Sequence, residues 1–77
     1  MKTVQISLNS IDKVKSFVND ITKFDYDFDL VSGRYVIDAK SIMGIFSLDL
    51  SKAIDLNIHD DGNIDDILKT LAPYIVE

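Results

Sequence analysis

The sequence predicts an α+β fold, an open-faced sandwich in which three helices cover one face of a sheet of four short strands. Two observations carry this prediction. Three short segments alternate apolar and polar residues, which is typical of strands buried on one face, and a fourth has a β-rich composition. Three others repeat apolar residues at spacings of three and four, which is typical of amphipathic helices. In chain order these segments read βαββαβα, and because no linker, internal repeat or low-complexity segment interrupts them, we expect residues 1–77 to form one domain.

A strand and then a helix are predicted at the start of the chain. The apolar residues that alternate along the strand are Val4, Ile6 and Leu8. The apolar stripe of the helix consists of Ile11, Val14, Phe17, Val18 and Ile21. We expect Asn9 or Ser10 to cap the first amides of this helix, and Asp12 to lie favourably near the positive end of its dipole.

A hairpin is predicted next, because two β-rich runs flank Ser32 and Gly33, and glycine supplies the positive φ angle of a tight reversal. In the first run, the side chains predicted to face the core are those of Tyr26, Phe28 and Leu30. The second run continues through residues 35–37. Because a helix connects the first strand to the second, we expect these two strands to run in the same direction, and the hairpin then reverses it.

The second half of the chain is predicted to hold a short helix, a strand and a last helix. The short helix spans Ser41 to Leu48, and the strand spans Ala53 to His59. A turn is expected at "HDDGN", residues 59–63, before a helix that Pro73 ends. The apolar stripe of that last helix consists of Ile64, Ile67, Leu68 and Leu71.

Composition and charge exclude several classes of function. No cysteine is present, so disulfides, thiol nucleophiles and thiolate metal sites are absent. Thirteen acidic against eight basic side chains give a net charge of −5, which disfavours binding to nucleic acid or to anionic membranes. No apolar run approaches the roughly 20 residues that span a bilayer, and the N-terminus does not resemble a signal peptide, so we expect a cytoplasmic protein.

Two acidic clusters invite a metal-binding interpretation, which the spacing disfavours. The segment "DYDFD" contains Asp25, Asp27 and Asp29, but a calcium loop needs glycine and glutamate where this chain has Leu30 and Val36. A solvated strand face is the favoured interpretation. The second cluster, Asp60 and Asp61 beside His59, is equally weak. We expect no metal and no cofactor, and because no paired base and nucleophile or phosphate loop is found, we expect no enzymatic activity.

One segment carries a family resemblance. The pentapeptide "KSIMG", Lys40 to Gly44, is followed by "SL" and then by a strand, and Lys23-Phe24-Asp25 and Gly33 precede it at family-like spacing. With these motifs the chain, from about residue 4 to 72, resembles HPr, the histidine-containing phosphocarrier of the bacterial sugar phosphotransferase system, and its regulatory paralogue Crh. The resemblance implies the HPr-like sandwich with a four-stranded antiparallel sheet.

The sequence departs from the family at the phosphate-carrying position. In HPr a histidine before the first helix carries the phosphoryl group, with an arginine and a proline shortly after it, and counting back from Lys23 places Ser10, Asp12 and Lys13 there. A serine does not replace an imidazole in this chemistry. The only histidine is His59. We interpret it as an exposed turn residue, with a relocated phosphate carrier as the alternative.

The resemblance also implies a regulatory site. Ser41 matches the serine that a dedicated kinase phosphorylates, although a serine there also serves as a simple helix cap. The family's partner-binding patch matches Ile42, Met43 and Phe46. A helix this short cannot bury all its apolar residues, so some are expected to be exposed for docking, or else to lie along the rim while Ile45 and Leu48 pack inside.

Together these features predict an HPr-like protein without the active-site histidine, acting as a regulatory or protein-interaction module related to the phosphotransferase system and carbon-source control. Its expected partners are proteins: phosphotransferase-system enzymes, a serine kinase or a transcription regulator. The alternatives are a phosphoryl-transfer component that uses another residue, and a structural or oligomeric domain without a phosphate-linked role.

Overall fold

The computed structural model describes residues 2–59, 62 and 64–76. Its elements follow the order βαββαβα that the sequence predicts. They are β1 (Lys2–Ile6), α1 (Ile11–Ile21), β2 (Asp27–Ser32), β3 (Tyr35–Asp38), α2 (Ile42–Phe46), β4 (Ile54–His59) and α3 (Asp65–Leu71). The predicted α+β sandwich is therefore confirmed.

The four strands form one antiparallel sheet in the order β1-β4-β2-β3. Strand β4 lies in the centre, where it pairs antiparallel with β1 on one side and with β2 on the other. Because β1 and β2 both oppose β4, they run in the same direction, as the sequence predicts. The hairpin of β2 and β3 turns at Gly33, whose φ of 60° is the positive value expected there.

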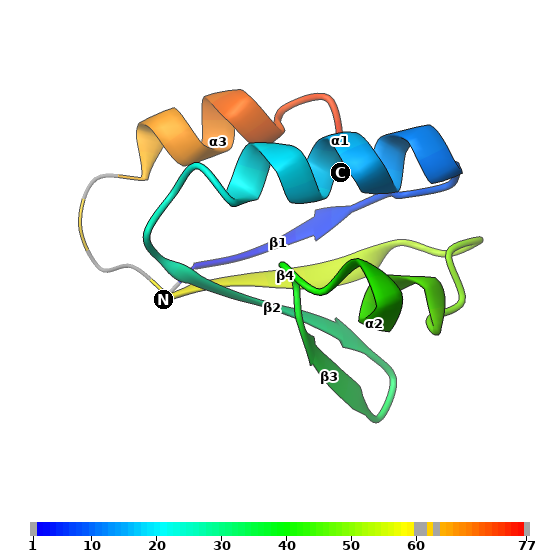
Figure 1. Cartoon of the computed structure of the whole chain (residues 1–77). Coiled ribbons are helices and arrows are strands. Elements are labelled where there is room, and N and C mark those ends of the chain that lie inside the picture. Colours follow the sequence, from blue (N-terminus) through cyan, green and yellow to red (C-terminus); the bar gives the residue numbers. More distant parts are fainter. Residues whose placement is uncertain (1, 60–61, 63, 77) are drawn as a thin grey trace.

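The helices lie on one side of the sheet, and its other face is open (Figure 1). Helices α1 and α3 lie next to each other across the sheet, and α2 lies on the same side, where it contacts α1 and β3. Strand alternation explains this arrangement, since Phe28 pairs with Ile58 and Leu30 with Leu56 on the covered face. The residues between them, such as Asn57, face the open side.

Among the described residues, sixteen buried apolar side chains form the core between the two layers. Helix α1 contributes Val14, Phe17 and Ile21, as its predicted stripe requires. Tyr74, beyond α3, packs edge-on against Phe17 with ring centroids 5.5 Å apart, and its hydroxyl donates a hydrogen bond of 2.8 Å to Asp20. Burial, and then this contact with Asp20, raises the pKa of Tyr74 to about 12. The C-terminal segment therefore clamps α1 to the sheet.

The structure corrects several boundaries and orientations. Tyr26 precedes β2 and is 38% exposed, and Ile11 at the first turn of α1 is 62% exposed, so neither belongs to the core. Leu8 is buried but lies beyond the end of β1, and α2 ends at Phe46 rather than Leu48. Alternation and periodicity predict which face of a strand or helix is buried, but they do not predict the residue at which the strand or helix ends. The predicted turn at residues 59–63 falls largely outside the described residues.

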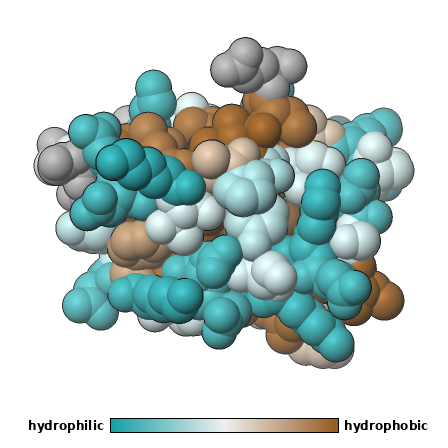
Figure 2. Space-filling model, turned by 90° about the horizontal axis from the view of Figure 1, so that it is seen from above, coloured by the Kyte–Doolittle hydropathy of each residue, from teal (hydrophilic) through white to brown (hydrophobic). Residues whose placement is uncertain are grey.

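The surface above α1 and α3 is mostly hydrophilic, with hydrophobic residues in separate patches (Figure 2). Within the described residues, none of the helices combines the length and the apolar character that crossing a bilayer requires.

Candidate functional site

The candidate site is the surface of α2 and the residue that caps it. Ser41 adopts an extended backbone conformation, and its hydroxyl oxygen accepts a hydrogen bond of 3.3 Å from the amide of Gly44. Its carbonyl accepts another from the amide of Ile45 at 3.0 Å. The first bond satisfies an amide that a helix N-terminus leaves without a partner inside the helix, and the second is the first hydrogen bond of the helix itself. Ser41 is nonetheless exposed, so its hydroxyl is accessible.

The segment before α2 is fixed to the rest of the fold by Lys40. Its ammonium donates a hydrogen bond of 2.9 Å to the carbonyl of Phe24 and lies 5.7 Å from the centre of the Phe28 ring. Its amide donates to the Asp38 side chain at 2.9 Å, which closes a tight turn. Sequence reasoning missed this role, because the partner of Lys40 lies 16 residues earlier in the chain.

Helix α2 divides its apolar residues between the core and solvent. Ile45 is fully buried, and Ile42 is partly buried against the core. Met43 is 78% exposed and Phe46 is 40% exposed. Of the three residues predicted to bind partners, two therefore present apolar surface to solvent and the third supports them. We call Met43 and Phe46, with the partly buried Ile42, the α2 patch.

Gly44 allows α2 to lie close to its neighbours. A β-carbon at this position would come within 3.2 Å of the Ser41 hydroxyl oxygen and within 3.3 Å of the end of the Ile37 side chain. Both contacts are tighter than ordinary van der Waals separations. The absence of a side chain at Gly44 therefore lets the serine cap and the packing on β3 coexist.

The start of α1 is built with a similar cap. The Ser10 hydroxyl oxygen accepts a hydrogen bond of 3.1 Å from the amide of Lys13, and Asp12 lies in the first turn. This confirms Ser10, rather than Asn9, as the capping residue. Ser10 is exposed and no histidine lies here, because the only one in the chain is His59 at the end of β4.

His59 is exposed, as predicted, but it is the last residue of β4 and not a turn residue. Its Nε2 atom lies 2.5 Å from a carboxylate oxygen of Asp29 on the neighbouring strand β2, with both side chains partly exposed. Asp27 is its direct partner in the strand pairing. Thirty residues separate His59 from Asp29, so only the sheet register brings them together.

Only two of the three aspartates predicted to share an acidic strand face lie on the strand. Asp27 and Asp29 lie on β2 and face the open side of the sheet, whereas Asp25 precedes the strand. Asp29 is partly buried and pairs with His59, so this face is not simply solvated. No group of metal-ligating side chains suited to an ion occurs among the described residues. Of the second cluster, Asp60 and Asp61 lie outside these residues.

Solved structures of phosphocarrier proteins share the fold of this chain. HPr-C-His from Thermoanaerobacter tengcongensis is 27% identical, with a TM-score of 0.74 over 95% of this chain and 89% of that one. The phosphocarrier protein HPr from Bacillus anthracis strain Ames is 29% identical, with a TM-score of 0.69 over 97% and 94% of the two chains. The chain is HPr-like. A Mycoplasma histidine-containing phosphocarrier protein, 18% identical with a TM-score of 0.63 over 94% and 91% of the chains, agrees in fold.

The HPr-like assignment rests on fold and on moderate identity over nearly the whole length of both chains. No protein-family model matches the sequence, and no curated protein matches it. The resemblance seen in "KSIMG" thus agrees with the three-dimensional comparison.

Proposed function

We propose that this HPr-like chain is a regulatory or protein-interaction module related to the sugar phosphotransferase system and carbon-source control, and that it does not relay phosphate as HPr does. The proposal rests above all on one observation: α2 exposes Met43 and Phe46 directly after an accessible serine, Ser41. We further propose that the chain catalyses no reaction itself.

The surroundings of Ser10 support the loss of phosphate transfer. A phosphocarrier needs a group that forms a high-energy phosphoryl bond near neutral pH, and a serine hydroxyl does not. Here the hydroxyl oxygen is engaged as a helix cap. Asp12, in the first turn, adds a negative charge that repels phosphate. This end of α1 is therefore suited to stabilising the helix.

The α2 patch supports a docking role for protein partners. Exposed apolar side chains lose contact with water when a partner covers them, and methionine adapts its shape to different surfaces. Because Lys40 holds the start of α2 and Ile45 anchors its centre, the patch is presented on a fixed support. In this proposal Ser41 is the regulatory phosphorylation site, since phosphate there adds negative charge beside the patch.

The alternative, phosphate transfer through His59, is less well supported. Its ring pairs with Asp29, and Asp27 lies opposite it in the strand pairing. Two carboxylates repel the phosphoryl dianion that such a carrier must hold. A structural domain without a phosphate-linked role remains the other outcome that the following experiment distinguishes.

The test compares the original chain with the Phe46→Asp variant. Calorimetry measures the affinity of each for the purified serine kinase and for the general enzyme of the phosphotransferase system. We expect the variant to weaken binding at least tenfold, since buried aromatic residues dominate interface energetics. Val36→Asp is the matched control, because Val36 is 63% exposed and, opposite Val31 in the hairpin, lies on the open face of the sheet and not on the face that α2 covers. If the folded Phe46→Asp protein binds as the original does, or if neither enzyme binds, the docking proposal is wrong.

A further inference from the structure

The outer side of strand β3 is an open edge of the sheet. The sheet order β1-β4-β2-β3 leaves one side of β1 and one side of β3 without a neighbouring strand. The C-terminal segment closes the β1 side, where the amide of Ser7 donates to the carbonyl of Tyr74 at 2.8 Å and the amide of Val76 donates to that of Gln5 at 2.9 Å. In Figure 1 no strand or helix of the described residues lies beyond β3. This edge can therefore accept a further strand.

The backbone of Val36 points outward from the β3 edge. In an antiparallel pair, residues whose amide and carbonyl face the neighbouring strand alternate with residues whose groups face away from it. The amide of Ala39 donates to the carbonyl of Phe28 at 2.9 Å, so by alternation Ile37 faces β2 and Val36 faces away. No turn, loop or cap among the described residues supplies a hydrogen bond to Val36. Its amide and carbonyl are thus available to a second strand.

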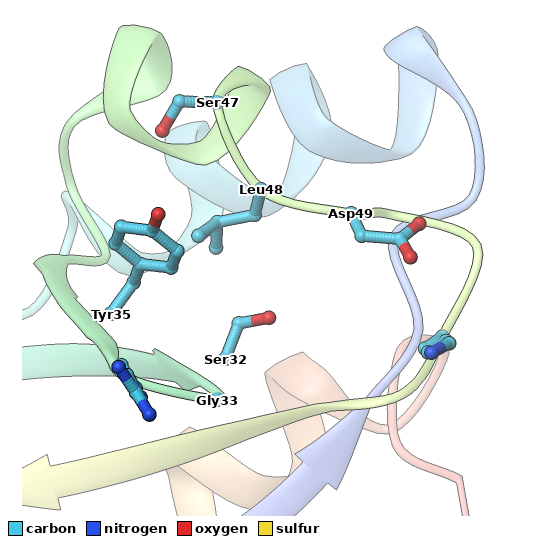
Figure 3. A pocket seen from close by; sticks show the side chains of 8 residues that line it. Ser32, Gly33, Tyr35, Ser47, Leu48 and Asp49 are labelled. Atoms are coloured by element: carbon cyan, nitrogen blue, oxygen red, sulfur yellow. The ribbon is translucent and has the colours of Figure 1, made fainter.

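The side chains of β3 leave apolar surface exposed on both sides of the strand. Tyr35 is 70% exposed and Val36 is 63% exposed. Tyr35 points from the hairpin toward Ser47 and Leu48, which line the same pocket of about 360 Å³ on the side of α2 (Figure 3). Val36 pairs with Val31 on the open face of the sheet. A strand added beside β3 would remove part of both exposed side chains from water.

The two ends of β3 carry opposite charges. Arg34, in the turn before the strand, is exposed and forms no hydrogen bond or ion pair with the other described residues. Asp38, the last residue of the strand, is exposed and lies opposite Asp29 in the hairpin, so negative charge gathers there. A strand that is positive at one end and negative at the other is complementary to a copy of itself that runs in the opposite direction.

We propose that two copies of this chain pair their β3 strands in antiparallel orientation about a two-fold axis, which joins the two four-stranded sheets into one. In this pairing Val36 lies opposite Val36 of the second copy, and the two exchange both of their outward hydrogen bonds. The same register places Arg34 opposite Asp38 of the second copy, twice by symmetry, and Tyr35 opposite Ile37. A shift of two residues in either direction would instead place Val36 opposite a charged residue.

The expected association is weak, because β3 has only four residues and the interface is correspondingly small. Interfaces that bury less than about 1,200 Å² are commonly transient, so we expect a dissociation constant on the order of 0.1 mM. The residues that carry this pairing are not those of the α2 patch, so the proposal does not rest on the docking function. The docking test is run well below this concentration, where every variant is a monomer.

The test is self-association of the full chain, measured by sedimentation equilibrium and amide NMR from about 0.01 to about 1 mM, a range that brackets the expected dissociation constant. We expect the average mass to rise toward that of two chains, with concentration-dependent shifts at the amides of residues 34–38. Val36→Pro should remain a monomer, since proline removes the outward donor but no hydrogen bond to β2. A chain that stays monomeric throughout would leave this edge to a segment of another protein and would overturn the proposal.

Charge reversal tests the register. Arg34→Asp should weaken self-association about tenfold, because two attractive pairs become two repulsive ones. Lys15→Asp is the matched control, since it changes the net charge equally at an exposed position on α1 and should have little effect. An equal mixture of Arg34→Asp and Asp38→Arg should associate as the original chain does, because unlike variants again place opposite charges at both positions.

The proposal is wrong if Arg34→Asp or Val36→Pro associates as strongly as the original chain, or if the concentration-dependent shifts are confined to α2 or to β1. The amide spectrum of each variant reports directly whether it is folded. Asp38 also accepts a hydrogen bond of 2.9 Å from the amide of Lys40. Should Asp38→Arg fail to fold for this reason, Arg34→Asp and Val36→Pro decide the outcome without it.

Discussion

Helices α1 and α2 both begin after a serine whose hydroxyl oxygen accepts a hydrogen bond from the amide three residues later, at 3.1 Å for Ser10 and 3.3 Å for Ser41. Their surroundings differ. Helix α1 spans eleven residues, buries three of them and is clamped by Tyr74. Helix α2 spans five residues and buries only Ile45. The same cap thus completes a structural helix in one place and lies beside exposed apolar surface in the other.

This comparison teaches that a capping serine by itself indicates no function. What distinguishes Ser41 is the α2 patch beside it, since Met43 is the most exposed of the large hydrophobic residues in the described part of the chain. Because Met43 is exposed, packing of α2 does not require an apolar residue at position 43. Four experiments sharpen the contrast between the two helices.

The largest expected effect comes from the residue that anchors α2. Ile45→Ala should lower the free energy of unfolding by about 3 kcal/mol, because it leaves a cavity under a helix with no other fully buried residue. Met43→Ala on the same helix should change it by less than about 0.5 kcal/mol, since that side chain is exposed. Urea denaturation measures both values. Equal losses would show that α2 is not divided between core and surface.

The clamp on α1 should produce the next effect. Tyr74→Phe keeps the ring packing but removes the hydrogen bond to Asp20, and should cost about 1.5 kcal/mol near pH 7. Tyr26→Phe is the control, because Tyr26 is exposed and makes no side-chain hydrogen bond among the described residues.

The same tyrosine predicts a dependence on alkaline pH. Its pKa is raised from 10.0 to about 12 in the folded protein, first by burial and then by Asp20. The folded state therefore favours the protonated form, and this stability is complete below about pH 10 and is lost as the pH rises toward 12. Thermal unfolding between pH 9 and 12 should reveal this loss in the original protein and not in Tyr74→Phe. If the unfolding temperatures of the two proteins fell in parallel with pH, the contribution of Tyr74 to the stability of the fold would be contradicted.

The smallest effects are expected at the two caps. Ser10→Ala and Ser41→Ala should each cost about 1 kcal/mol, whereas Ser10→Asp and Ser41→Asp should be nearly neutral, because aspartate caps as well as serine does. Chemical denaturation of the four variants measures this. A loss for Ser41→Asp as large as for Ser41→Ala would mean that the surroundings of α2 do not tolerate negative charge, which counts against a regulatory phosphate there.

The fold could be predicted from the sequence because its elements are short and clearly patterned. Alternation identified Phe28 and Leu30, and spacing identified Val14 and Phe17, since burial on one face is a local property of a strand or helix. Exceptions occur at element ends. Ile11 continues the stripe of α1, but it is the first residue of the helix and is exposed.

The candidate site could be predicted only in part. The sequence from "KSIMG" to Phe46 pointed to Ser41 and to the residues of the α2 patch, because they lie close together in the chain. The pair of His59 and Asp29, and the position of β3 at an edge of the sheet, depend on how strands far apart in the chain come together. The sheet order β1-β4-β2-β3 places them, and local patterns carry no information on that order.

The most direct test of the proposed function is incubation of the full chain with ATP and the kinase that phosphorylates the regulatory serine of HPr, followed by intact-protein and peptide mass spectrometry. We expect one phosphate per chain on Ser41, and none on Ser41→Ala. Ser10→Ala, which removes the other helix-capping serine, should be phosphorylated like the original protein. An unmodified chain, or phosphate on a residue other than Ser41, would contradict the proposal.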